Sequence, residues 1–118
     1  MISLRPANIT EAIATPSLKA MVAQHGTESA VKAVAAVITQ ADMMLGGGMQ
    51  PGVLVEMAHL FIDQYQGRPI GTIMMGVRRG MQDKTIGHKL TYPILCQWME
   101  AMDAAVEEHN YNEHLRTK

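Results

Sequence analysis

Apolar residues recur at steps of three and four along most of this sequence, which is the spacing of one face of an α-helix. The longest such stretch runs from Glu28 to Leu45, and its regularly spaced apolar positions are Val31, Val34, Ile38, Ala41 and Leu45. Its β-branched residues would also suit a strand, but its length and its alanines favour a helix. Further alanines and valines make this helix apolar on most faces, so we expect it to be buried at the centre of the fold.

Two more amphipathic helices are predicted, one beginning at Pro51 and one capped by Thr91. The apolar face of the first consists of Leu54, Met57, Ala58, Phe61 and Tyr65, and its polar face of Glu56, Asp63 and Gln64. The apolar face of the second consists of Leu95, Trp98, Met102, Ala105 and Val106. Because Met57 and Met102 lie on these apolar faces, we expect both in the core.

Threonine, proline and glycine mark the ends of the helices near the start of the chain. Thr15 is suited to the cap of a helix with Pro16 in its first position, and Gly26 is suited to end that helix. Thr27 is expected to cap the long central helix.

The remaining connections also contain glycine or proline. The glycine triplet at residues 46–48 predicts a flexible connection between helices, because it lacks the lysine and serine or threonine of a phosphate-binding loop. Pro69 is expected to open a short helix that ends near residue 80, in which Gly71 and Gly76 each cost about 1 kcal/mol relative to alanine. Residues 82–91 are expected to form an irregular loop or a short irregular extended pair.

These elements predict an all-α protein: a compact bundle of about five helices joined by loops that glycine and proline mark. We expect a loose N-terminal arm over residues 1–14, a single helical domain over residues 15–110, and a frayed C-terminal tail over residues 111–118. The chain has 118 residues, a length that supports one domain and buries about two-thirds of the unfolded surface.

Cysteine content and hydropathy narrow the class of protein. The single cysteine, Cys96, excludes an intramolecular disulfide framework. The longest apolar stretch is shorter than the roughly 20 residues that cross a bilayer, and the first residues lack the apolar core of a signal peptide. These features favour a cytoplasmic protein.

The formal net charge of −1 conceals an uneven distribution. Residues 68–89 contain five basic side chains and one acidic side chain, a net charge of +4. The rest of the chain contains five basic and ten acidic residues, a net charge of −5. The candidate binding residues of this segment are its five basic side chains together with His88. The five are Arg68, Arg78, Arg79, Lys84 and Lys89.

Two interpretations of this basic segment stay open. Its cations could simply stabilise the end of the short helix through the helix dipole. They could also contact phosphates, as in a nucleic-acid-binding module. Aromatic residues make up 4% of the chain, and Tyr92 is the aromatic residue close to the segment. The lack of rings disfavours stacking on single-stranded bases.

Methionine is unusually frequent, with eleven methionines against five aromatic residues. Methionine fills gaps in cores and is also common on adaptable binding surfaces. Met74 and Met75 cannot both face the same way on a short helix, so one of them is a candidate for contact with a partner protein or a second copy. A homodimer is expected because the apolar content exceeds what five short helices bury among themselves.

Catalytic chemistry has little support in the sequence. The histidines form no i, i+4 pair, and His109 and His114 are five residues apart, which separates them around a helix. Cys96 follows the apolar Leu95 and is expected to be a buried, unreactive thiol. We therefore expect no catalytic residue, no metal site and no cofactor. A small enzyme with His59 or His88 as a base is the less favoured alternative.

From Ser17 onward, the order of these features resembles a family of small all-α proteins of unknown function from bacteroidete genomes and their phages or mobile elements. The resemblance covers about residues 17–108. It is carried by Ser17-Leu18, His25-Gly26, the apolar residues 31–38, Met49-Gln50-Pro51, Glu56-Met57-Ala58, Phe61-Ile62, the break at residues 65–69, the helix over residues 70–79, Gly87, Leu90-Thr91 and Gln97-Trp98-Met99.

The resemblance implies a helical fold and a mobile-element context, and members of the family often look like replication-accessory or helicase-loader-like proteins. The sequence therefore predicts a non-enzymatic accessory protein of a phage or mobile element that binds another protein, such as a component of the replication machinery. Met74, Met75 and the basic segment would form its binding face. The alternative is a small nucleic-acid-binding module that uses the same basic segment.

Overall fold

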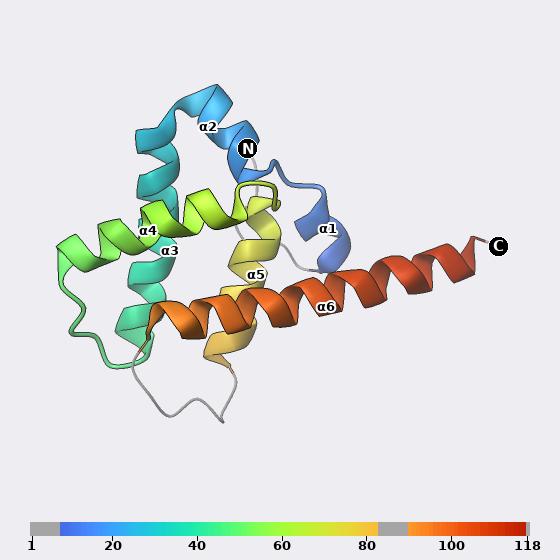
Figure 1. The fold of residues 1–118 in the computed structure, drawn as a ribbon. Coiled ribbons are helices and arrows are strands. Elements are labelled where there is room, and N and C mark those ends of the chain that lie inside the picture. Colours follow the sequence, from blue (N-terminus) through green and yellow to red (C-terminus); the bar gives the residue numbers. More distant parts are fainter. Residues whose placement is uncertain (1–7, 83–89, 118) are drawn as a thin grey trace.

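The structure, a computed structural model that describes residues 8–82 and 90–117, is all-α (Figure 1). Within those residues it contains six helices and no strand, which confirms the predicted fold class. The helices are α1 (Ile9–Ile13), α2 (Leu18–His25), α3 (Thr27–Met44), α4 (Pro51–Tyr65), α5 (Ile70–Met81) and α6 (Tyr92–Arg116). The extended pair considered for residues 82–91 falls largely outside the described residues.

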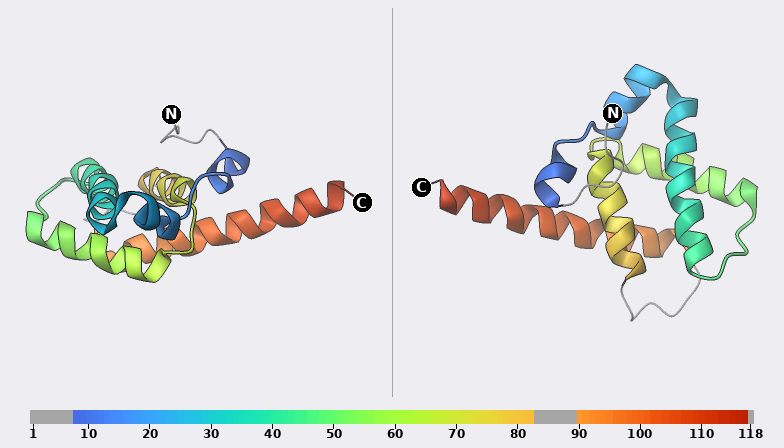
Figure 2. Two further views of the ribbon diagram at one scale, coloured as in Figure 1. Left: turned by 90° about the horizontal axis from the view of Figure 1, so that it is seen from above. Right: turned by 180° about the vertical axis from the view of Figure 1, so that it is seen from behind.

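The helices form two crossing layers. Helices α3 and α5 lie side by side, and α4 and α6 cross them on one face, as both figures show (Figures 1 and 2). Helix α2 packs against α3, and the short α1 packs against α5. The α4–α3 and α6–α5 crossings enclose the main core.

The core contains the apolar faces that the helical spacing predicts. On α4, Met57, Ala58, Phe61 and Tyr65 are buried and Leu54 is half-buried. The largest side chains with essentially no exposure are Phe61, Leu18, Ile38, Ile73, Leu95, Met99 and Val34. Met57 and Met102 are both buried, which confirms their assignment to the core.

Two of the predicted helix caps are wrong. Ser17, not Thr15, caps α2, because its hydroxyl accepts the Ala20 N–H at 3.1 Å. Gly26 ends α2 and is also the N-cap of α3, where its φ of 87° favours glycine, so Thr27 is already helical. Thr91 caps α6 as predicted, since its hydroxyl accepts the Ile94 N–H at 3.4 Å.

The chain between α1 and α2 pairs in an antiparallel direction with the connection between α4 and α5. The Ile70 N–H donates to the Pro16 carbonyl at 2.8 Å, and the Leu18 N–H donates to the Arg68 carbonyl at 3.1 Å. The Thr15 hydroxyl accepts the Gly71 N–H at 2.7 Å. Thr15 therefore joins the α1–α2 connection to the first turn of α5 instead of capping a helix.

The two ends of the described chain are more ordered than predicted. Ala12 of α1 is fully buried in a small cluster with Met75 and Met102, so residues 8–14 are docked and not a loose arm. Helix α6 continues to Arg116, so most of residues 111–118, which were expected to form a frayed tail, are helical. Arg116 stabilises this end because it pairs with Glu113 at 2.7 Å and places a cation near the helix C-terminus.

Candidate binding surface

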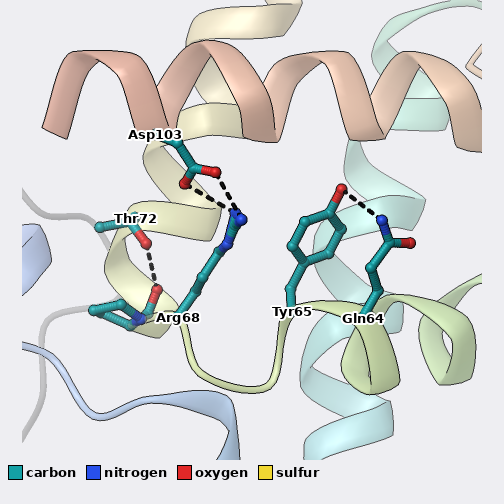
Figure 3. A network of polar contacts seen from close by, with 6 residues as sticks. Gln64, Tyr65, Arg68, Thr72 and Asp103 are labelled. Atoms are coloured by element: carbon teal, nitrogen blue, oxygen red, sulfur yellow. Dashed lines mark hydrogen bonds and ion pairs between the residues drawn. The ribbon is translucent and has the colours of Figure 1, made fainter. Parts of the chain in front are cut away.

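Of the predicted basic residues that the structure describes, Arg68 lies apart from Arg78 and Arg79, at the opposite end of α5. Arg68 points toward α6, where its Nη2 lies 2.7 Å from Asp103 Oδ2 and its Nη1 donates to Oδ1 at 2.9 Å (Figure 3). Its guanidinium also lies 4.4 Å from the centre of the Tyr65 ring. Arg68 thus links the α4–α5 connection to α6. Lys84, His88 and Lys89 lie outside the described residues.

The Asp103 carboxyl shows how this ion pair balances opposing effects. Burial raises the pKa of Asp103, the neighbouring Glu107 and Glu100 raise it further, and Arg68 lowers it, with a net rise. Arg68 therefore compensates Asp103 for a partly desolvated position between two other acids.

Two tyrosines and a glutamine form a second polar link between α4 and α6. Gln64 Nε2 donates to the Tyr65 hydroxyl at 3.3 Å (Figure 3). The Tyr92 hydroxyl in turn donates to Gln64 Oε1 at 2.7 Å. Burial, with a smaller effect from Cys96, raises the pKa of both Tyr65 and Tyr92. Both phenols are therefore neutral at ordinary pH and serve to hold the helices together. Cys96 itself is half-buried, so the expected full burial of its thiol is not observed.

The two candidate methionines separate as their adjacent positions require. Met75 is 2% exposed and lies in the cluster with Ala12 and Met102, which puts it in the core. Met74 is half-buried on another side of α5. Of the pair, Met74 is thus the residue at the surface.

Arg78 and Arg79 occupy the last turn of α5 and diverge around it. Arg78 is half-buried and lies one turn beyond Met74, whereas Arg79 is exposed. Arg79 borders a hollow between α5 and α6 that is lined also by Gly76, Gly80, Trp98, Ala101 and Met102.

An apolar pocket between α2, α3 and α5 is the feature that sequence reasoning missed. Its volume is about 260 Å³, and its lining residues are Pro16, Met21, Gln24, His25, Ala33, Ala36, Val37, Ile70 and Met74. Apart from Gln24 and His25 at the end of α2, every lining side chain is apolar. Met74 therefore reaches the surface at the edge of a pocket and not on an open helix face.

The sequence contains a sign of this pocket in the composition of α3. Apolar residues on most faces of α3 predicted burial at the centre of the fold, and one face is indeed buried through Val34 and Ile38. On the other side Ala36 is exposed and Ala33 and Val37 are half-buried. This second apolar face forms the floor of the pocket.

The described histidines do not assemble into a metal-binding group. His59, predicted at the edge of the apolar face of α4, is exposed, and His109 Nε2 lies 3.2 Å from the Thr10 hydroxyl. Within residues 8–82 and 90–117, no group of three or more histidine, cysteine, aspartate or glutamate side chains could hold a metal ion.

Searches of protein-family models, curated proteins and solved structures found no match to this chain. None of the helices in the described part of the chain is both long and apolar enough to span a membrane. The surface described above is therefore interpreted from its own geometry.

Proposed function

We propose that this protein is a non-enzymatic cytoplasmic adaptor that binds another protein through the pocket between α2, α3 and α5. The observation that carries the proposal is an open pocket of about 260 Å³ with an almost entirely apolar lining. The family resemblance in the sequence supports an accessory role in a phage or mobile element. Components of the replication machinery are the partners to test first.

The lining favours a protein segment over a small metabolite. Pockets for small ligands usually have volumes of roughly 300–1,000 Å³. This pocket is smaller, at about 260 Å³, and its two polar side chains, Gln24 and His25, lie together at one end. Met21 and Met74 are flexible side chains that adapt to the shape of an inserted apolar group. An amphipathic helix that inserts apolar side chains would suit this lining.

Charge next to the pocket favours an acidic partner segment. Arg78 lies one turn beyond Met74 on α5, whereas Arg79 borders the hollow on the other side of that helix. A cation beside an apolar anchor site improves the association rate and the specificity for a segment with acidic residues next to its apolar ones. The proposed partner segment is therefore an amphipathic helix that carries apolar anchors and acidic neighbours.

Selection from a displayed library of helical peptides tests this function. We expect enriched peptides to carry apolar residues at i, i+3 or i, i+4 spacing together with acidic residues. Their binding should be lost on Ala36→Glu, which puts a charge in the pocket at an already exposed position. Ala23→Glu, the same change at an exposed position of α2 outside the lining, is the matched control and should leave binding unchanged.

Two results would contradict the proposal. One is the absence of any enriched peptide, and the other is equal binding of enriched peptides to the Ala36→Glu and Ala23→Glu variants. A separate experiment addresses the nucleic-acid alternative with labelled duplex DNA at increasing salt. A steep loss of affinity, with a slope of roughly −0.9 per phosphate contact, that is abolished by Arg78→Glu with Arg79→Glu but unaffected by Ala36→Glu would favour that alternative instead.

A further inference from the structure

The last third of α6 extends away from the other described helices. The body of the protein ends at the contact between His109 and Thr10, 3.2 Å apart, and the helix then continues to Arg116 (Figures 1 and 2). Along this extension Tyr111 is 63% exposed and Leu115 is 51% exposed. Asparagine and histidine are weak helix formers, and a short unsupported helix is marginally stable in water. Packing against a second molecule would stabilise the extension.

Tyr111 and Leu115 belong to a longer exposed stripe on α6. Its positions are separated by alternating steps of four and three residues, which is the spacing of a seam between two packed helices. The exposed residues of this α6 stripe are Gln97, Ala101, Ala104, Glu108, Tyr111 and Leu115. Small side chains occupy the half near the body, and large ones occupy the extension.

The hollow between α5 and α6 lies beside the small half of this stripe. Its volume is about 180 Å³, and Ala101 is one of its lining residues, along with Trp98 and the exposed Arg79. Beyond His109 the extension contains one glutamate and one arginine, Glu113 and Arg116, which pair with each other at 2.7 Å. The hollow therefore offers space where the extension offers the bulk of Tyr111 and Leu115.

We propose that two copies of this chain pair through antiparallel α6 helices. Tyr111 and Leu115 of each copy then pack on Ala104 and Ala101 of the other copy, next to the hollow that Trp98 and Arg79 line. Because the small half and the large half belong to the same stripe, a two-fold axis places the large half of each copy against the small half of the other. Because the pocket proposed above lies on the other side of α5, this pairing leaves it open.

The pairing also predicts an unfavourable contact at its centre. Glu108 lies midway between Ala101 and Leu115, so the two-fold axis brings the Glu108 side chains of both copies together. Like charges in this position weaken the pairing. Removal of this charge should strengthen it, which a substitution that merely disturbs the helix would not do.

Sedimentation equilibrium over a range of concentrations tests the pairing. We expect dimers of the wild type, an increase of about tenfold or more in the dissociation constant for Leu115→Asp and Tyr111→Asp, and a decrease for Glu108→Gln. Leu60→Asp, the same change at an exposed leucine of α4, is the matched control and should leave the constant unchanged. Circular dichroism melting verifies that each variant folds.

Disulfide trapping locates the contact. In a Cys96→Ser background, Ala101→Cys combined with Leu115→Cys should form disulfide-linked dimers, because each cysteine meets the other cysteine of the second copy. Neither single cysteine variant should form such dimers, because the same residue in the two copies is about 20 Å apart in this arrangement. The two cysteines within one helix are also about 20 Å apart and cannot pair with each other. A wild type that stays monomeric at millimolar concentration, or dimers that Leu115→Asp and Tyr111→Asp leave unchanged, would overturn the proposal.

Discussion

Gly80 of α5 lies directly against the indole of Trp98 on α6. A Cβ atom at residue 80 would come within 2.1 Å of Trp98 Cδ2, which is closer than any real contact. Gly76, one turn earlier, has a similar relationship to Met99, whose Cε would lie 2.8 Å from an added Cβ. Gly76 and Gly80 weaken α5 as an isolated helix, but they allow α6 to pack closely on it.

Gly80→Ala should destabilise the protein by about 1–3 kcal/mol, because the steric cost exceeds the gain in helix propensity. Gly52→Ala is the matched control, since Gly52 is helical and an added Cβ there meets no atom within 4 Å. That control should be neutral or slightly stabilising. Urea denaturation followed by the fluorescence of Trp98 measures both. Equal stabilities of the two variants would show that α5 and α6 do not approach as described.

Thr15→Val should cost about 1–3 kcal/mol, because it leaves the N–H of the buried Gly71 without its acceptor. The control is Thr39→Val, where the hydroxyl donates to the Ala35 carbonyl within α3 at 2.7 Å. Loss of that bond leaves no buried donor unpaired. Hydrogen exchange of the Gly71 amide provides the local measurement, and protection that survives Thr15→Val would contradict the assigned contact.

The wild type should lose stability in alkaline solution through Tyr65 and Tyr92. Their pKa values are raised in the folded protein above the ordinary value of 10.0, chiefly by burial. The folded state therefore holds these protons more tightly, and the resulting stability is complete below pH 10 and lost as the pH rises through the folded-state values. Relative to Tyr65→Phe and Tyr92→Phe, the wild type should become less stable between pH 9.5 and 11.5, roughly the range in which unfolded tyrosine ionises.

Denaturation at several pH values tests this prediction. The free-energy difference between the wild type and each buried-site variant is the quantity to follow. A difference that stays constant across the alkaline range would mean that neither phenol is held in its neutral form by folding.

Arg68→Gln should lower stability by about 1 kcal/mol and leave binding intact. The partly exposed ion pair and the contact with the Tyr65 ring each contribute modestly. A double-mutant cycle with Asp103→Asn isolates the pairwise energy. If Arg68→Gln abolished binding to DNA or to an enriched peptide without loss of stability, Arg68 would belong to a binding site and not to the link with α6.

Local sequence signals were sufficient for much of the fold. The spacing of apolar residues on α4 predicted its buried face, and the glycines at residues 46–48, all with positive φ, do separate α3 from α4. Thr91 was also recognised, because its capping partner lies three residues away. These features depend on neighbours close in sequence, which is why they could be predicted.

Features that depend on distant partners were missed. Thr15 looks like a helix cap, but its hydroxyl pairs with Gly71, which lies 56 residues away. Arg68 appears to belong to a basic cluster until Asp103, 35 residues away, neutralises it. The apolar pocket arises because α2 and α5 cover only part of the second apolar face of α3, and no local pattern records how far a neighbouring helix extends.

The methyl NMR spectrum of the methionines gives the most direct test of the pocket between α2, α3 and α5 as a protein-binding site. Met21 and Met74 line the pocket, whereas Met57 and Met99 are buried in the core. When an enriched helical peptide is added to protein labelled at its methionine methyl groups, we predict shifts of the Met21 and Met74 signals with the Met57 and Met99 signals unchanged. Binding that leaves the Met21 and Met74 signals unmoved would contradict the account.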